Sequence, residues 1–238
     1  MQPTFLPWAG YINLIASVDL FVFLDDAQYE RASWQNRNRI LVAGEATWLT
    51  VPVCRDQLGA SLDKVWTDDK LQWRRKHLRT LEQAYARTPG RAEMMDIVHG
   101  LEGAGPSPLA DLNISLLEAI CVRLGVATPT MRSSALAIAG RRTERLVSIL
   151  ERVGCTEYVT TPGALDYLGE DGFSAMSGLP LLVHRFIPPT YRQHGAPVFV
   201  SHLSIVDVIA SLGCGDASDY VRGDARWLEP YVTLRLAR

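Results

Sequence analysis

The first thirty residues constrain the fold more than any other part of this sequence. The stretch "MQPTFLPWAGYINLIASVDLFVFLDD" begins with a proline-rich turn, continues with apolar residues at helical spacing, and reaches an apolar run, Val18–Leu24, that ends in two aspartates. A short run rich in valine and phenylalanine is typical of a strand buried on both faces, as in a parallel sheet. We therefore expect a first strand at Met1–Thr4, a helix over residues 8–17 and a second strand at Val18–Leu24.

The remaining sequence alternates between strand and helix patterns. A hairpin is predicted around Ala43–Gly44–Glu45, where two strand-like runs flank a turn. The other predicted helices cover residues 70–87, 91–102, 110–124, 142–153 and 203–213, and the other predicted strands cover residues 129–133, 157–161 and 179–186. The predicted fold class is α/β, with a mostly parallel Rossmann-like sheet and an inserted helical region. We expect a single domain over residues 1–238, with 103–108 as the best internal break.

Several helix ends have sequence signals of their own. Asp68 or Asp69 can cap the helix over residues 70–87, and Pro89–Gly90 can end it. Ser204 is the predicted cap of the last helix, and Gly213 is its predicted end.

Composition and missing motifs exclude several classes of protein. The net charge is −2, which argues against a general nucleic-acid binder. No apolar run is long enough to span a membrane, and the first residues lack the pattern of a secretory signal. The four cysteines are far apart and lack zinc spacing, so we expect buried thiols in a reducing cytoplasm and no metal site. A P-loop and a glycine-rich dinucleotide fingerprint are also absent, and we expect no cofactor.

The proline-rich turn is a candidate binding site. Turns between a strand and a helix of α/β proteins bind ligands because helix amide groups point outward there. Pro7 would make the turn rigid, Gly10 would allow a close approach, and Trp8 and Tyr11 would offer flat faces with polar tips. The alternative is an aromatic plug that covers the end of the sheet.

Acidic and polar residues follow the strand at Val18–Leu24. Asp25, Asp26 and Gln28 should arrive near Tyr11, since the ends of parallel strands meet at one edge. Such carboxylates can bind a metal, orient an amine or accept a proton. Simple capping of a turn is the alternative.

Basic residues are concentrated in two segments. In "ERASWQNRNRI", Arg37 and Arg39 share one face of an extended chain, and arginines suit phosphate or carboxylate ligands. The predicted binding edge there consists of Arg31, Trp34, Asn36, Arg37 and Arg39, and a solvated basic hairpin is the alternative. In "WRRKHLR", Lys76 and His77 are the candidates, although a solvated helix face explains most of that segment.

The motifs "QPTFLPWAGY", "DLFVFLDDAQY", "WQNRNRI", "WLTVPV", "WRRKHLRTL" and "LSIVDVIASLG" together resemble the WbqC-like family over nearly the whole chain. That family is associated with bacterial O-antigen, lipopolysaccharide or specialised-metabolite gene clusters. The resemblance implies modification of an amino sugar or related amine by acyl or aminoacyl transfer. Family members have apolar residues before the QP motif, and this sequence starts at Met1–Gln2, so the start is trimmed or the first strand is very short.

The first half also resembles, more distantly, pantothenate synthetase and related nucleotidylyltransferases. The HxGH motif of those enzymes would fall on Trp8 and Tyr11 around Gly10, where no histidine is present. Neither side chain carries the positive charge that stabilises phosphoryl transfer. Adenylation by the usual route is therefore not expected.

The residues and the resemblance together predict a cytoplasmic transferase that forms an amide or related C–N bond on an amino sugar or sugar nucleotide. Its partners would be anionic small molecules. The predicted catalytic residues are Asp25 or Asp26 as base, His77 as the second candidate base, and Tyr11 as hydrogen-bond donor. Gln2, Pro7, Trp8, Gly10, Gln28, Lys76 and Tyr191 join the arginine segment as predicted binding residues. The alternatives are a non-catalytic binding or scaffold protein and a degenerate nucleotidylyltransferase.

Overall fold

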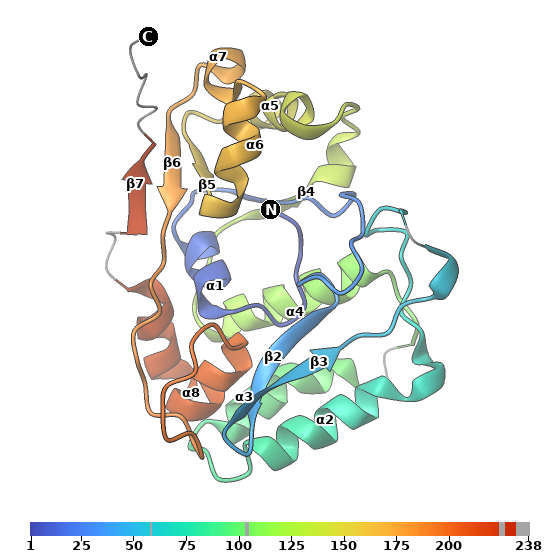
Figure 1. The fold of residues 1–238 in the computed structure, drawn as a ribbon, viewed down its shortest axis with the longest axis vertical. Helices are drawn as coiled ribbons and strands as arrows, with labels where there is room; N and C mark the ends of the chain where they lie inside the picture. The colour runs from blue at the N-terminus through green and yellow to red at the C-terminus, as the bar shows by residue number, and fades with distance from the viewer. Residues whose placement is uncertain (58, 103–104, 224–226, 232–238) are drawn as a thin grey trace. The chain divides into compact units, whose positions relative to one another are not determined.

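The computed structural model describes residues 1–57, 59–102, 105–223 and 227–231 of the 238-residue chain. The chain divides into two compact units (Figure 1). Unit 1 comprises Met1–Arg132 and Pro188–Gly223, and unit 2 comprises Ser133–Ile187 and Asp224–Arg238. The single domain stays a prediction, and residues 103–104 of the expected break lie outside the described residues.

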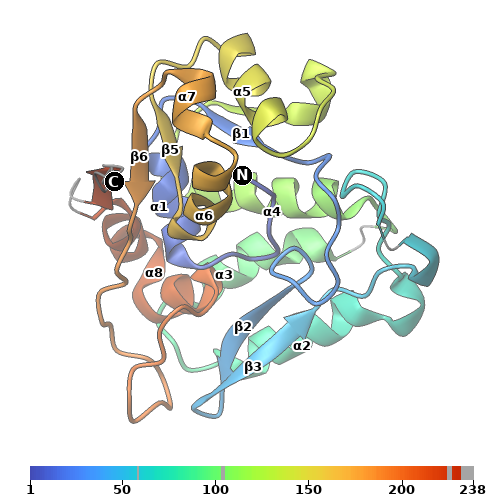
Figure 2. The same cartoon turned by 45° about the horizontal axis from the view of Figure 1, so that its top comes forward.

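Unit 1 holds most of the helices and two small sheets. Its elements are α1 (Ala9–Ala16), β1 (Phe21–Phe23), β2 (Arg37–Val42), β3 (Glu45–Thr50), η1 (Arg55–Gln57), η2 (Asp69–Leu71), α2 (Trp73–Ala84), α3 (Arg91–Val98), η3 (His99–Leu101), α4 (Leu109–Arg123), β4 (Thr130–Arg132) and α8 (Ile205–Arg222). β1 pairs in parallel with β4, and β2 pairs with β3 as the predicted antiparallel hairpin. Helices α1 and α3 both contact α8, as Figures 1 and 2 show.

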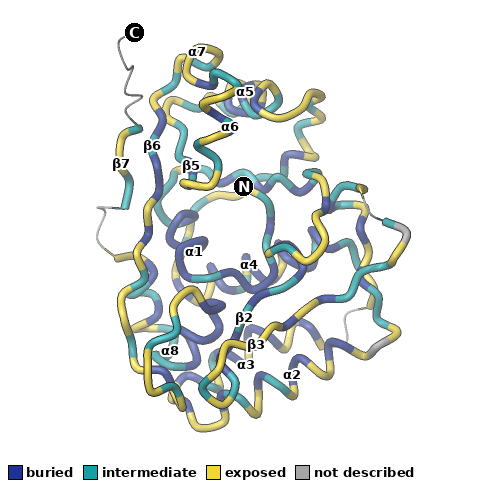
Figure 3. The backbone as a smooth tube through the Cα atoms, in the orientation of Figure 1, coloured by how far each residue is buried: buried dark blue, intermediate teal, exposed yellow. Residues whose placement is uncertain are grey.

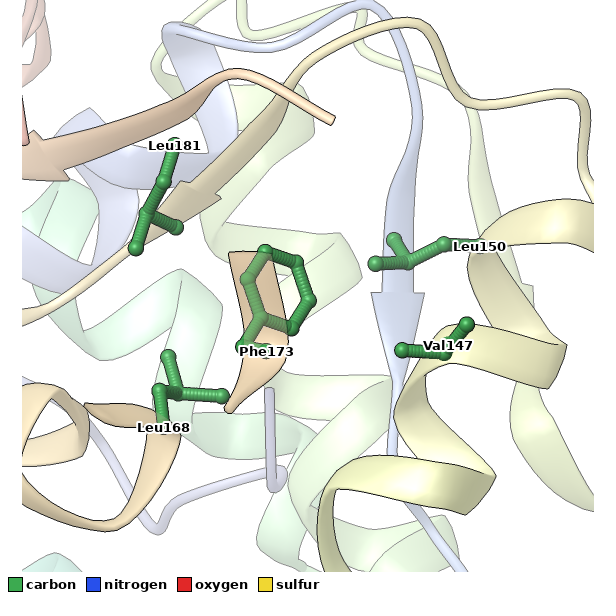
Figure 4. Packing of buried hydrophobic residues seen from close by; sticks show 5 residues of the cluster. All are labelled: Val147, Leu150, Leu168, Phe173 and Leu181. Atoms are coloured by element: carbon green, nitrogen blue, oxygen red, sulfur yellow. The ribbon is translucent and has the colours of Figure 1, made fainter. Parts of the chain in front are cut away.

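Unit 2 is a small mixed α/β unit. Its elements are η4 (Ser133–Leu136), α5 (Arg142–Arg152), β5 (Tyr158–Thr160), η5 (Pro162–Ala164), α6 (Leu165–Glu170), α7 (Phe173–Ser177), β6 (Leu181–His184) and β7 (Leu228–Pro230). Parallel β5 and antiparallel β7 flank β6. The core consists of Val147, Leu150, Leu168, Phe173 and Leu181, which come from three helices and one strand (Figure 4).

The mixed α/β content agrees with the predicted fold class. A mostly parallel Rossmann-like sheet is not shown, since the described strands form small sheets in which both strand directions occur. Apart from the hairpin strands, each strand has only three or four residues. The predicted strand at Val18–Leu24 shortens in this way to Phe21–Phe23.

The N-terminal segment, residues 2–7, explains part of this difference. It forms no strand because Pro3 and Pro7 lack an amide hydrogen, and Leu6 has a φ of 40°, outside the range of a strand. Met1, directly before this segment, still lies at the end of β1, where the Leu24 amide donates to the Met1 carbonyl at 2.8 Å. The expected strand at Met1–Thr4 is thus replaced by an irregular chain in which only Pro3 is buried.

Side chains take the place of strand pairing for the N-terminal segment. Its carbonyls accept hydrogen bonds from the Tyr11 hydroxyl (to Gln2, 2.8 Å), the Asn113 amide (to Pro3, 3.1 Å), the Asn38 amide (to Phe5, 3.2 Å, and Leu6, 2.9 Å), the Ser204 hydroxyl (to Leu6, 2.7 Å) and the Ile205 backbone amide (to Pro7, 2.6 Å). Buried carbonyls without such partners would be costly. The segment is therefore held by α1, α4, β2 and the start of α8.

The predicted signals at helix ends are found in part. The expected end of the first of these helices at Pro89–Gly90 is wrong, because α2 already ends at Ala84 with Tyr85 as its cap, and Gly90 instead precedes α3. Asp68 caps η2 by accepting from the Lys70 amide at 3.1 Å, and α2 begins only at Trp73. Ser204 caps α8 as predicted. At Gly213 the regular helix is interrupted (φ 79°, ψ 166°), but the chain resumes as helix because a Glu93 carboxylate oxygen accepts from the Cys214 amide at 2.7 Å.

The two strands of the hairpin differ in how far their residues are buried. Figure 3 shows exposed residues along most of β3, whereas β2 alternates between buried and partly exposed positions. α1 and α4 contribute long buried stretches. Among the described residues, no helix is both long and apolar enough to cross a membrane.

Asn113→Ala tests the support of the N-terminal segment. The Asn113 amide donates to the Pro3 and Gln35 carbonyls and is fully buried. Removing it leaves two buried carbonyls without this donor, so the free energy of unfolding should fall by about 2–4 kcal/mol in urea titrations. Ser115→Ala, at an exposed position of the same helix, should change it by less than about 0.5 kcal/mol. Equal stability of the two variants would contradict this account.

Candidate functional site

The outer side of the hairpin carries arginine and tryptophan side chains in contact. We call Trp34, Arg37, Arg39 and Trp48 the hairpin face. The Arg37 guanidinium carbon lies 4.2 Å from the centre of the Trp48 ring, and that of Arg39 lies 5.9 Å from Trp48 and 6.0 Å from Trp34. The two indole rings are 5.3 Å apart. Distances up to about 6 Å allow cation–π attraction.

Strand periodicity produces this surface. Along β2, Asn38 and Ile40 point inward and are buried, whereas Arg37 and Arg39 lie on the opposite face and are partly exposed. The hairpin register sets Trp48 directly opposite Arg39. The inner asparagine anchors the strand to the N-terminal segment, so the arginines are held on a fixed backbone.

The hairpin face suits an anionic ligand that has a flat group. Trp34 and Trp48 remain 49% and 43% exposed, far more than is usual for tryptophan, so both present open ring surface. In the described part of the chain, the Nε atoms of Arg37 and Arg39 are buried and lack a hydrogen-bond partner. Guanidinium groups bind phosphate or carboxylate in a bidentate manner, and indole rings stack on sugars or bases.

A second cluster lies beside Arg39, at the start of α1. The Trp8 ring packs so closely over Gly10 that a Cβ atom there would come 2.4 Å from the ring carbons. The His202 imidazole lies 4.7 Å from the Trp8 ring, tilted by 31°. The close approach that Gly10 permits is thus made by Trp8 itself, and a role of Gly10 toward a ligand stays a prediction.

The predicted catalytic groups near β1 are mostly enclosed. Tyr11 is buried and donates its hydroxyl hydrogen to the Gln2 carbonyl, and burial raises its pKa. The Gln2 side chain accepts from Gln35 Nε2 at 2.8 Å. Asp25 is 1% exposed, whereas its neighbour Asp26 is partly exposed. Asp26 is therefore the more accessible carboxylate of the pair.

The remaining predicted residues of this region differ in exposure. Gln28 and Arg31 are exposed, and the Gln28 carbonyl accepts from Gln35 at 3.2 Å. Asn36 is buried and donates its side-chain amide to the Val51 carbonyl at 3.0 Å. Pro7 is buried in the N-terminal segment. Their roles in ligand binding stay predictions, and Asn36 is occupied in fixing the hairpin.

The two candidates on α2 point in different directions. Lys76 is exposed, whereas His77 is buried against Phe5 and Trp73, with ring centres 6.2 and 5.2 Å away. Burial lowers the pKa of His77 to about 4, and hydrogen bonding to the Thr50 and Trp73 backbones opposes this shift. His77 is therefore neutral at physiological pH.

Tyr191 takes part in a buried network that the sequence did not reveal. The Tyr191 hydroxyl donates to the Asp207 carboxylate at 2.5 Å. The same carboxylate also accepts hydrogen bonds from the Tyr85 hydroxyl at 2.8 Å and from Gln193 Nε2 at 3.1 Å. Asp207 is fully buried, and burial raises its pKa despite these hydrogen bonds. The network fixes the loop before α8, which also carries His202.

Two residues of these clusters, Trp48 and His202, were not predicted from the sequence. A signal for Trp48 existed, because a two-residue turn at Ala43–Gly44 places it opposite Arg39. His202 follows Arg39 by more than 160 positions, and no local pattern relates them. Within the described ranges, no three His, Cys, Asp or Glu side chains gather as they would around a metal ion.

The sequence of this chain matches a known protein family over most of its length. Residues 2–218 match the profile of the WbqC-like protein family. The uncharacterized protein Rv1507c of Mycobacterium tuberculosis is 34% identical over 226 residues, which cover 93% of this chain and 96% of that protein. No solved structure matches the chain.

Burial of neutral His77 predicts a pH-dependent stability. Its pKa is about 4 when folded and about 6.5 when unfolded, so the unfolded chain gains the proton first as pH falls. This residue should lower the free energy of unfolding by about 2 kcal/mol between pH 8 and 5.

The measurement is the difference between the wild type and His77→Gln in denaturant titrations across this range. The variant should lose that part of the pH dependence. His99→Gln, at an exposed position, should retain it. If both variants follow the wild type, His77 is not the residue responsible.

Proposed function

The chain belongs to the WbqC-like protein family, and we propose that it is a transferase that forms an amide or related C–N bond on an amino sugar or sugar nucleotide. The hairpin face is the observation that supports this proposal. Its arginines suit the phosphate groups of a sugar nucleotide, and its exposed tryptophans suit the sugar or base. An amino-sugar ligand is also what the resemblance to this family implies.

The chemical step needs a base, because an amine is mostly protonated at neutral pH. Asp26 is our first candidate, since it follows β1 and is partly exposed. Asp25 and His77 are enclosed and could act only on a group that enters the unit. The proton would pass from the attacking amine to the carboxylate as the C–N bond forms and the donor's leaving group departs.

A non-catalytic binding protein is the second candidate function. The observation in its favour is that Tyr11, Asp25 and His77, three of the four predicted catalytic side chains, are buried. A degenerate nucleotidylyltransferase has less support, since the positions of its histidines are held by Trp8 and Tyr11.

The ligand proposal predicts losses of affinity on the hairpin face. Calorimetry with UDP-N-acetylglucosamine should show binding about ten- to hundredfold weaker for Arg37→Ala, which loses a bidentate phosphate contact. Trp48→Ala should lose about tenfold through lost stacking. Arg87→Ala removes an exposed arginine outside the hairpin and should bind like the wild type. Unchanged affinity in both hairpin variants would contradict the ligand proposal and favour the alternative interpretation, a solvated basic hairpin.

The catalytic proposal predicts a separate effect on turnover. Amino-sugar nucleotides are incubated with acyl and aminoacyl donors, and amide products are detected by mass spectrometry. Asp26→Asn should lower turnover about a hundredfold while sugar-nucleotide binding is retained. Asp19→Asn, an exposed change before β1, should leave turnover intact. Binding without any product in the wild type would favour the non-catalytic protein instead.

A further inference from the structure

His202 and Trp8 lie where three segments of unit 1 meet. Trp8 forms a β-bridge with Ser204, whose amide donates to the Arg39 carbonyl at 2.8 Å. The segment before α8 therefore lies along the edge of β2, and it carries His202 next to Arg39. This junction is separate from the tryptophan pair of the hairpin face but shares Arg39 with it.

The backbone at this junction is held in an unfavourable conformation. His202 has a φ of 58°, in the left-handed region that non-glycine residues seldom adopt. Leu6, whose carbonyl accepts from Ser204, has a φ of 40°. Strained residues persist only where the surroundings impose them, and they are concentrated at functional sites. Here the surrounding contacts keep the His202 ring beside Trp8, although the residue as a whole is exposed.

Arg39 and His202 can both carry a positive charge, and no carboxylate is paired with either of them among the described residues. Burial lowers the pKa of His202, and the positive charge of Arg39 lowers it further. Of the other groups at the ring, Trp8 is neutral and the Ser201 hydroxyl lies 3.0 Å from Nδ1. Among the described residues, neither Arg39 nor His202 is paired with a carboxylate. An anion between them would remove the repulsion and complete both sets of hydrogen bonds.

We infer that Arg39, His202 and Trp8 form a second subsite that binds a phosphoryl group of the sugar nucleotide, with His202 in its protonated form. This subsite rests on the proposed function, because it extends the same ligand along β2. The Arg39 guanidinium lies about 6 Å from both tryptophans of the hairpin face, and its backbone carbonyl accepts from Ser204, two residues after His202. A nucleoside diphosphate ester matches this order, since it has a flat ring at one end and two successive phosphoryl groups.

Protonation on binding gives the subsite a measurable signature. The free imidazole is mostly neutral near pH 7, and a neighbouring phosphoryl group raises its pKa, so binding takes up a proton from solvent. The affinity should therefore increase as pH falls from about 8 to about 6. UDP-N-acetylglucosamine is the probe, because its esterified diphosphate does not titrate in this range.

The test is calorimetry in buffers of different ionisation enthalpy, which counts the protons taken up. The wild type should gain a fraction of one proton per ligand near pH 7. His202→Asn should gain none and should bind about tenfold more weakly at pH 6, with little change at pH 8. Asparagine is chosen because it tolerates a positive φ, and unchanged thermal unfolding would show that the variant is folded. His194→Gln, an exposed histidine in the same loop, is the matched control.

The outcomes separate this subsite from the proposed function. If Arg37→Ala weakens binding but His202→Asn keeps the proton uptake and pH dependence of the wild type, the subsite is wrong and the hairpin face stands. If the wild type does not bind the probe, both proposals fail. If His202→Asn loses the proton uptake and His194→Gln keeps it, the subsite and the sugar-nucleotide ligand of the proposed function are supported.

Discussion

Buried carbonyl groups of the N-terminal segment are the constraint on which the rest of unit 1 depends. A segment with two prolines and a positive φ at Leu6 cannot pair as a strand, yet it runs through the interior. Its carbonyls therefore need donors from elsewhere, and these come from Asn38, Asn113, Tyr11 and Ser204. Each donor belongs to a different element, so satisfying one segment fixes the positions of a strand and three helices.

The hairpin shows how this internal requirement shapes the outer surface. Successive side chains of a strand point to opposite faces, so an inward Asn38 sets Arg37 and Arg39 outward. The same strand thus anchors the N-terminal segment and presents two guanidinium groups beside Trp48. The binding surface that we propose is rigid for this reason, since moving the arginines would break buried hydrogen bonds.

The buried network around Asp207 has a comparable role on the other side of β2. The Tyr85 hydroxyl donates to Asp207 and accepts from the Leu41 amide, so the network connects α2, β2 and α8. Tyr191 and Gln193 add the loop before α8. A carboxylate in an apolar interior is costly unless several donors surround it, and three such donors are present here. The loop that carries His202 is held in place by this network.

Local patterns predicted most of the helices and the hairpin, because periodicity and turn residues act over a few positions. The face shared by Arg37 and Arg39 follows from strand geometry alone. The predicted large parallel sheet, in contrast, depends on pairing between distant segments, which local patterns do not specify. Whether apolar runs such as Val18–Leu24 extend into long strands depends on the partners available, and the proline-rich segment offers few amide hydrogens for pairing.

The sequence by itself determined the family, the longer helices and the hairpin with its arginine- and tryptophan-rich chemistry, but not the short elements α6, α7 and β7. Only the tertiary structure decided which polar side chains serve the interior. Tyr11, Asn36, His77 and Tyr191 have residue types suited to a binding site, but burial and hydrogen bonding engage them inside the protein. The contact between the His202 and Trp8 rings likewise depends on the tertiary structure. Contacts between residues almost two hundred positions apart depend on how helices and strands pack, and no local pattern records that packing.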